Sequence, residues 1–480
     1  MGQKIYSENI SLWRNKFINN LLSKQVWVII LFGLTIGWLT VIFPIELVLI
    51  CTSLTAIIFA INKYKTCFLL LLFFLPFSGY LTFEFQGGTV FPHDIAIPAL
   101  FFVWVFNGLI VKRTSITYSK NDTPVIVYFL LCFLSLLYAL LRFSSAPIAI
   151  DKILFLKAYL NQIRVVGELI MFFLIARNIL KLDDLFKIIK IMIAVCIIES
   201  IIIIFQFLGM GGSLFSTTTH GGAGSLRFGG TLGVGGIAII LQILIPIVMV
   251  LLLMKEEAGI NKGYLRLYLF LFTVALLLTQ TRTAWVAVVI STFIISYFYR
   301  KLWLIWLMGV VAGIYMIPFG RARLLSILDP RLAYYVVDRL AIWAEGLRLY
   351  FGNLLLGVGK GNFGFFSRFY GVFGINYAHN QYLTIAAEMG TVGLIVFMWF
   401  IVRVVRVGWS NFRTLGGQYK VLSLGLFAII LAIYVSCLGG EFIFPQTPKA
   451  IIPGLYVWLV IVFIFKLNER KKFVNLTEID

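Results

Sequence analysis

Long apolar stretches separated by short polar segments constrain this chain more than any other feature of its sequence. Fourteen such stretches follow one another, and a bilayer needs about 20 apolar residues per helix, with shorter ones tolerated where they are buried or flanked by cations. Of the 480 residues, 61% are hydrophobic and only 12% are charged, against about 25% charged in soluble domains. The sequence therefore predicts an all-α, polytopic membrane helix bundle of about 14 spans, with 12–14 compatible with the pattern.

A polar segment near residue 350 interrupts the series of apolar stretches. The expected spans are Val26–Phe43, Leu47–Ile61, Cys67–Tyr80, Ile95–Val111, Val125–Leu141, Val165–Ile179, Ile191–Phe207, Thr231–Met254, Leu267–Leu278, Ala284–Tyr299, Leu302–Ile317, Gln381–Val402, Leu422–Leu438 and Ile451–Phe465. We expect N-terminal membrane helices in 1–230, central membrane helices in 231–317, one large outer loop in 318–379 and C-terminal membrane helices in 380–480.

The distribution of lysine and arginine predicts the orientation of the chain, because short cytoplasmic loops are enriched in them. With the N-terminus inside, most of the 40 basic residues fall on the cytoplasmic side, so both termini are predicted there. The first apolar run has no small-residue cleavage site after it and is followed by Pro44 and another span. It therefore has the pattern of a signal anchor.

The basic residues expected on the outer side are concentrated in a few segments. Seven lie in the large loop, four lie between the fifth and sixth spans, and three stand beside outer helix ends: Arg321, Arg323, Arg331, Arg339, Arg348, Lys360, Arg368; Arg142, Lys152, Lys157, Arg164; and Arg227, Arg282, Lys449. Such a face indicates an anionic ligand, and the planar fork of arginine suits phosphate. The alternative is that these cations reach toward lipid headgroups.

Within the large loop, apolar residues recur every three or four positions from Arg331 to Tyr350. This period predicts an amphipathic helix that lies on the membrane, with an apolar stripe that includes Leu340, Trp343 and Leu347. Arg339 is one turn from Trp343, so a guanidinium could be held over the mouth of the bundle. Packing at the interface is the simpler role for Trp343.

The glycine-rich segment Gly357–Phe363 follows this helix. It resembles a phosphate-binding loop, but it lacks the strand before it and the helix after it that such a loop requires. We therefore interpret it as a tight turn that glycine permits and that returns the chain toward the membrane.

His379 opens the next span, at the junction of the cationic loop and a membrane helix. A neutral imidazole there can accept a proton from a hydroxyl, although a histidine that only hydrogen-bonds backbone at a helix start is the alternative. Asn380, Thr384 and Glu388 are spaced four apart and share one helix stripe. This stripe could support His379 or line an acceptor path, or it could form a hydrogen-bond seam between helices. For Glu199, inside another span, we expect a buried hydrogen bond to a neighbouring helix.

Three motifs together resemble the O-antigen ligase and polymerase superfamily. They are Thr279–Trp285 at a helix start, Gly357–Phe363, and the segment His379–Leu394 with its His-Asn-x-Tyr-Leu start and its Glu388-x-Gly390 core. The resemblance implies a membrane glycosyltransferase of the bacterial inner membrane that takes a glycan from undecaprenyl diphosphate on the periplasmic side. By position, it implies that His379 is catalytic and that Arg282, Arg339 and Arg227 bind the diphosphate.

The partners that the resemblance implies are the lipid-linked donor, a glycan or lipid acceptor and membrane lipids, with no nucleic acid. No cofactor is expected. The outer side carries no Asp-x-Asp pair, and the five cysteines fall in apolar runs, so neither a metal site nor disulfides are indicated.

Two alternatives stay open at the level of the sequence. Fourteen spans and a central Glu199 would also suit a transporter, such as a flippase for lipid-linked glycans or an anion carrier, although transporters collect polar groups and broken helices at the midplane. Within glycosyl transfer, a polymerase and a ligase need the same donor site. The cationic segment between Arg142 and Arg164 slightly favours the polymerase.

Overall fold

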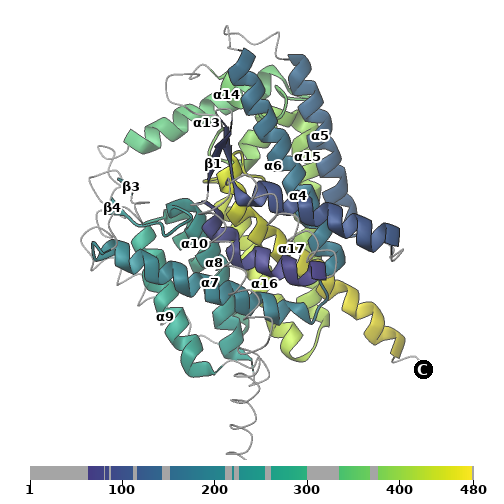
Figure 1. Ribbon diagram of the computed structural model, residues 1–480, viewed down its shortest axis with the longest axis vertical. Coiled ribbons are helices and arrows are strands. Elements are labelled where there is room, and N and C mark those ends of the chain that lie inside the picture. Colours follow the sequence, from purple (N-terminus) through teal and green to yellow (C-terminus); the bar gives the residue numbers. More distant parts are fainter. Residues whose placement is uncertain are drawn as a thin grey trace, which may run out of the picture. The chain divides into compact units, whose positions relative to one another are not determined.

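In a computed structural model of the chain, residues 65–480 form one compact unit that is almost entirely helical (Figure 1). The structure describes residues 63–79, 82–85, 88–111, 116–142, 152–210, 219–220, 226–254, 261–299, 334–367 and 377–477. The expected spans Val26–Phe43, Leu47–Ile61 and Leu302–Ile317, and with them the expected signal anchor, lie outside these ranges. So do Arg321, Arg323, Arg331 and Arg368.

Among the described residues, eight helices are long and apolar enough to cross a membrane. They are α5 (Thr123–Arg142), α6 (Lys152–Ile179), α7 (Asp184–Phe207), α8 (Val234–Leu253), α9 (Lys262–Thr279), α15 (Gln381–Thr414), α16 (Gly417–Ser436) and α17 (Pro448–Thr477). The apolar helix α10 (Arg282–Phe298) is shorter. These helices confirm the predicted all-α membrane bundle.

The remaining elements are short, apart from one helix of the large loop. They are η1 (Leu75–Gly79), β1 (Phe83–Phe85), β2 (Gly88–Val90), α4 (Pro92–Trp104), the π-helix η2 (Val105–Val111), β3 (Thr219–His220), β4 (Leu226–Arg227), α13 (Tyr334–Gly352) and α14 (Phe363–Phe366). Two antiparallel hairpins pair β1 with β2 and β3 with β4. Helix α13 confirms the helix predicted from residue 331 to 350, and Leu340 and Leu347 of its apolar stripe are exposed.

Two expected spans are interrupted helices. Residues 63–74 are helical, but the chain then tightens into the 3₁₀ helix η1, which contains Pro76. Proline has no backbone N–H, and it restricts the residue before it. Helix α4 contains Pro98 and continues as the π-helix η2. Pro76 lies within the change of geometry in the first span, whereas Pro98 lies inside α4, before the π-helix begins at Val105.

Helix α6 begins at Lys152, well before the expected start at Val165. Lys152, Lys157 and Arg164 therefore lie on α6 itself, and the prediction that they lie between the fifth and sixth helices is wrong. Phe155 faces the core while Lys152 and Lys157 stay exposed. An amphipathic extension of this kind is missed when spans are sought as continuous apolar runs.

The centre of the bundle is formed by α8 and α17, whose membrane segments are the most deeply buried. Helix α17 packs against α6, α8, α15 and α16, and α5 lies beside both α6 and α15 (Figure 1). Trp458 of α17 is fully buried, and its ring stacks on Phe129 of α5 and Phe400 of α15. Its indole N–H donates to Ile443 O at 3.0 Å. This aromatic cluster joins three helices in the core.

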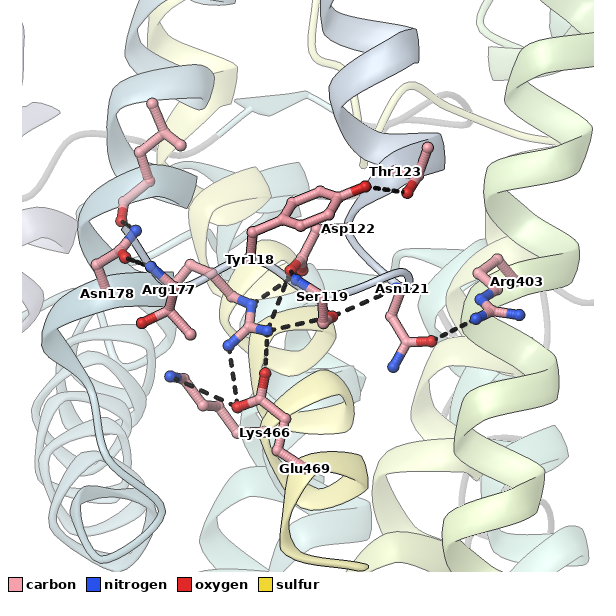
Figure 2. Close-up of polar contacts among 12 residues, drawn as sticks. Tyr118, Ser119, Asn121, Asp122, Thr123, Arg177, Asn178, Arg403, Lys466 and Glu469 are labelled. Carbon is pink, nitrogen blue, oxygen red and sulfur yellow. Dashed lines mark hydrogen bonds and ion pairs between the residues drawn. The ribbon is translucent and has the colours of Figure 1, made fainter. Parts of the chain in front are cut away.

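An ion-pair cluster joins α5, α6 and α17 at the end of α17 that carries Glu469 (Figure 2). Arg177 of α6 is 1% exposed and donates to both oxygens of Asp122, at 2.9 and 3.1 Å. The same guanidinium pairs with Glu469 of α17. Beside it, Arg403 of α15 donates to Asn121 Oδ1 at 2.7 Å. One buried arginine therefore holds two carboxylates from different parts of the chain.

Replacing Arg177 with methionine is expected to lower the free energy of unfolding by about 3 kcal/mol, because two carboxylates lose their shared cation. The comparison variant is Arg413→Ala on α15, an exposed arginine, for which a change below about 1 kcal/mol is expected. Denaturant titration of the detergent-solubilised protein measures both. Equal losses in the two variants would contradict the structural role of the buried cluster.

Candidate functional site

A cavity of about 400 Å³ lies where the N-terminal ends of α8, α10, α13, α15 and α17 meet. Its lining runs in sequence from Arg227 to Pro453, so residues distant in the chain share it. The charged or titratable side chains on its wall are Arg227, Arg339, His379, Glu441 and Lys449, with Tyr377 beside them. Three cations and one imidazole around a single carboxylate form a site with a net positive charge, which favours an anionic ligand.

The segment that carries Arg227 is fixed by buried polar groups. The Arg227 guanidinium donates to Thr279 O and to Thr281 Oγ1, both at 3.1 Å, at the junction of α9 and α10. A few residues later, Thr231 donates its N–H to Glu199 Oε2 at 2.8 Å and its hydroxyl to the other carboxylate oxygen. Glu199 thus forms the expected buried hydrogen bond, although its partner is the loop before α8 and not a helix.

Arg282 is the first residue of α10 and faces a second space beside the cavity. This groove, of about 370 Å³, is lined mainly by apolar groups that include Val286, Val435 and Leu438. Arg339 lines both the groove and the cavity. The structure therefore brings Arg227, Arg339 and His379 to one cavity and places Arg282 in the groove that adjoins it.

His379 has a left-handed backbone, with φ of 52°. Few residues other than glycine adopt this conformation, and those that do are often found at functional sites. The imidazole meets Tyr377 edge to face, with 4.6 Å between ring centroids. Burial, and then the neighbouring Arg339, lowers the pKa of His379 to about 4. The ring is therefore neutral near pH 7 and has a lone pair available to accept a proton.

Three contacts outside the cavity hold the segment around His379. The half-buried Trp343 donates its indole N–H to Ala378 O at 3.1 Å, so this residue anchors the loop to α13. Asn380 caps α15, since its side-chain oxygen accepts from the N–H groups of Tyr382 and Leu383. The Gln381 N–H donates to Cys437 O at 2.8 Å, which ties the start of α15 to the end of α16.

Glu441 is a site residue that the sequence analysis missed. Its carboxylate lines the cavity and accepts from the Asn380 N–H at 3.0 Å and from the Thr384 hydroxyl at 2.8 Å. Burial raises the pKa of Glu441 to about 7. An acid in the short segment between the last two spans, directly after Gly439 and Gly440, was the signal available in the sequence.

Glu388 is not among the residues that line the cavity. It is 1% exposed and pairs with the buried Lys360, with 3.4 Å between Oε2 and Nζ. Lys360 also approaches Gln446 Oε1 at 3.4 Å, and Gln446 reaches the cavity wall. Of the predicted stripe, Asn380 and Thr384 therefore bond to Glu441, through a backbone N–H and a hydroxyl. Glu388 pairs instead with Lys360 of the glycine-rich segment.

The glycine-rich segment packs its backbone against a break in α15. Gly357, Gly359 and Gly361 all have positive φ, which agrees with the predicted glycine turn. The helix is interrupted at Gly390, whose φ is 63°. The Gly359 N–H donates to Glu388 O at 2.8 Å, and Thr391 N–H donates to Leu354 O at 2.7 Å. Carbonyl and N–H groups freed by the break are thus satisfied by the turn.

Replacing Gly390 with alanine is expected to lower the free energy of unfolding by more than about 2 kcal/mol. A Cβ there would lie 2.3 Å from Leu355 O, on a backbone with positive φ. Gly167→Ala in α6 is the matched control, since a Cβ at Gly167 meets nothing within 4 Å. Thermal unfolding of both purified variants tests this, and a Gly390 variant as stable as the control would refute the close packing.

Several basic residues predicted to bind anions serve other contacts. Arg164 pairs with Asp94, and Arg348 pairs with Glu345 at 2.6 Å. Arg142 donates to Asn353 Oδ1 at 3.0 Å and lies over the ring of Phe366. None of these three arginines lines the cavity or the groove. In the described part of the chain, the contacts of Arg142 and Arg164 are thus with protein groups, while Lys152 and Lys157 of the same segment are exposed.

One group in the described part of the chain could hold a metal ion. His93, Asp94 and Glu168 bring one ligand atom each within 4.8 Å of one another. However, Arg164 pairs with Asp94 and lies 3.5 Å from Glu168, so a protein cation already balances part of the negative charge. These residues are also not among those that line the cavity.

Comparison with known proteins finds a family that part of the chain resembles. Residues 267–398 match the family described as O-antigen ligase. This segment includes Arg282, Arg339 and His379, whereas Arg227 and Glu441 lie outside it. No individually curated protein matches the chain. The apolar helices show a multi-pass membrane protein, and residues 267–398 of this protein are similar to the O-antigen ligase family.

Proposed function

We propose that this protein is a glycosyltransferase that moves a glycan from undecaprenyl diphosphate to an acceptor hydroxyl on the periplasmic side of the bacterial inner membrane. The observation that carries the proposal is the shared cavity of Arg227, Arg339 and His379. Cations suited to a diphosphate and a neutral base occupy one site there. The O-antigen ligase family is consistent with this class of reaction.

The donor lipid would use both spaces. Its diphosphate would lie between Arg282 and Arg339, because Arg339 lines both the groove and the cavity. Its polyprenyl chain would follow the apolar wall formed by Val286, Val435 and Leu438. The glycan would then enter the polar cavity, where Arg227 and His379 lie. This division matches the chemistry of a substrate with an apolar tail, an anionic link and a polar head.

The proposed step is a displacement at the anomeric carbon. The acceptor oxygen forms a bond to this carbon as its proton passes to the neutral imidazole of His379. The bond from the anomeric carbon to the diphosphate oxygen breaks, and its electron pair stays on the diphosphate. Arginines fixed before the reaction stabilise the charge that develops there without reorganising. The residues supply the base and the cationic site, and the scheme uses no resident cofactor.

The proposed orientation follows from the basic residues of the sequence. Both termini are assigned to the cytoplasm, and the cavity end of the bundle faces the periplasm. The cluster around Arg177 then lies on the cytoplasmic side, near the opposite ends of α15 and α17 (Figure 2). The proposed partners are the undecaprenyl-diphosphate-linked glycan, a glycan or lipid acceptor and the surrounding lipids.

Surface glycan and lipid-linked glycan from a host that lacks the protein test the proposal, with and without a plasmid carrying the wild type. Loss of long surface chains, with undecaprenyl-diphosphate glycan accumulating on the periplasmic side, is the expected result. Single repeats that still reach the surface identify a polymerase, whereas long chains that stay on the carrier identify a ligase. Donor that accumulates on the cytoplasmic side would contradict the transferase and indicate a flippase.

A further inference from the structure

The backbone N–H groups of the two residues that flank His379 are held by one chain of hydrogen bonds. The Ala378 N–H donates to Thr384 Oγ1 at 3.1 Å, and the Thr384 hydroxyl donates to Glu441 Oε1 at 2.8 Å. The Asn380 N–H donates directly to the same carboxylate oxygen at 3.0 Å. The N–H groups of Ala378 and Asn380, the residues on either side of His379, are therefore linked to a single carboxylate.

We infer that Glu441 is the positioning residue for His379, acting through Thr384 and the N–H groups of Ala378 and Asn380. This inference rests on the proposed function, and it assigns to Glu441 a part that the family match does not cover, since the match ends at residue 398. The carboxylate sets where the imidazole stands in the cavity, and the imidazole carries out the proton transfer.

The backbone of His379 makes such a support necessary. A non-glycine residue in the left-handed region costs of order 1 kcal/mol or more, and it persists only where its surroundings fix it. Glu441 is 9% exposed and Thr384 is fully buried. Hydrogen bonds from N–H and O–H groups to a carboxylate are stronger than neutral ones, particularly when they are shielded from water. The hydrogen bonds that end on Glu441 therefore fix the backbone on both sides of His379, the residue with the left-handed conformation.

The segment of Glu441 is itself fixed, so it can serve as a reference point. The Gln381 amide accepts from the Phe444 N–H at 3.1 Å and donates to Phe444 O at 3.3 Å. The N–H of Gln381 is bonded to Cys437 O at the end of α16. The start of α15 and the segment between α16 and α17 are thus joined on both sides of Glu441. A small displacement of a catalytic base lowers the catalytic rate more than it weakens substrate binding.

A transfer assay with purified protein and synthetic lipid-linked donor tests this inference through four single variants and one double variant. Glu441→Ala and Thr384→Val are expected to lower kcat by about 10- to 100-fold, with the KM for the donor within about twofold of wild type. Glu441→Gln and Thr384→Ser preserve an acceptor or a hydroxyl and are expected to recover most of that loss. The double variant is expected to match Glu441→Ala alone, because both changes break one chain.

Two further readouts separate the possible failures. Stabilisation of each variant by undecaprenyl diphosphate, measured by thermal unfolding, is expected to equal that of wild type, which excludes misfolding and loss of the donor site. A raised KM without a loss of kcat, or losses that multiply in the double variant, would overturn the positioning role. If His379→Ala transfers glycan like wild type, the proposed function itself fails. If that variant is inactive while Glu441→Ala is active, only the inference about Glu441 fails.

Discussion

Replacing His379 with alanine is expected to lower the rate of glycan transfer by about 10²- to 10⁴-fold, the usual contribution of a general base. The imidazole lines the cavity, and its pKa of about 4 keeps it neutral near pH 7. Without it, the acceptor hydroxyl loses the imidazole nitrogen that is proposed to take its proton. The measurement is the initial rate at saturating donor, together with lipid-linked glycan in complemented cells.

The second variant at this position is His379→Asn, which separates the ring from the backbone. Asparagine tolerates the left-handed conformation better than most residues, so the loop keeps its path while the base is absent. We expect both variants to fold, to bind donor and to be equally slow. An active asparagine variant would show that the backbone at this position matters and that the imidazole does not act as the base.

Replacing Arg339 with alanine is expected to lower kcat/KM by about 10²- to 10³-fold, as the loss of one fixed donor to a developing charge does elsewhere. Arg339 is the arginine common to the cavity and the groove, so it stands where the diphosphate would join the glycan to the lipid. Arg339→Lys is expected to recover only part of the loss, because an ammonium lacks the planar fork of a guanidinium.

Lys152→Ala is the matched control for Arg339, since Lys152 is an exposed cation on α6 that is not part of the cavity or groove wall. It removes the same charge from the protein and is expected to change kcat/KM less than twofold. If both variants lose activity to the same degree, the effect comes from the overall charge of the protein, and the assigned diphosphate site is wrong.

The apolar pattern of the sequence was sufficient to predict α13 and several of the described membrane helices. Continuous apolar runs identify α5 and α8 to within a few residues, because lipid selects for them directly. The same criterion fails for α6, where exposed Lys152 and Lys157 share a helix with buried Phe155. A continuous apolar run shows which part of a helix contacts lipid or the protein core. It does not show where an amphipathic extension of the same helix begins.

The candidate site was predictable only in part, for a related reason. His379 and Arg339 stand out because an imidazole and a guanidinium beside apolar runs are conspicuous by their type. Glu441 does not, since its role depends on Thr384, which is 57 residues away in sequence. Likewise, Lys360 has the appearance of a loop cation but is buried against Glu388. Contacts between distant parts of the chain determine which charged side chains stay available to bind a ligand. The spacing of residues along the sequence does not reveal these contacts.

Release of undecaprenyl diphosphate from a synthetic lipid-linked glycan, by purified protein in lipid nanodiscs, tests the central claim most directly. The proposed function predicts that release requires an acceptor, equals the number of new glycosidic bonds formed and is abolished by His379→Ala. Glycan that remains on its carrier under these conditions, while labelled donor crosses the bilayer of vesicles that contain the protein, would contradict the transferase and establish transport instead.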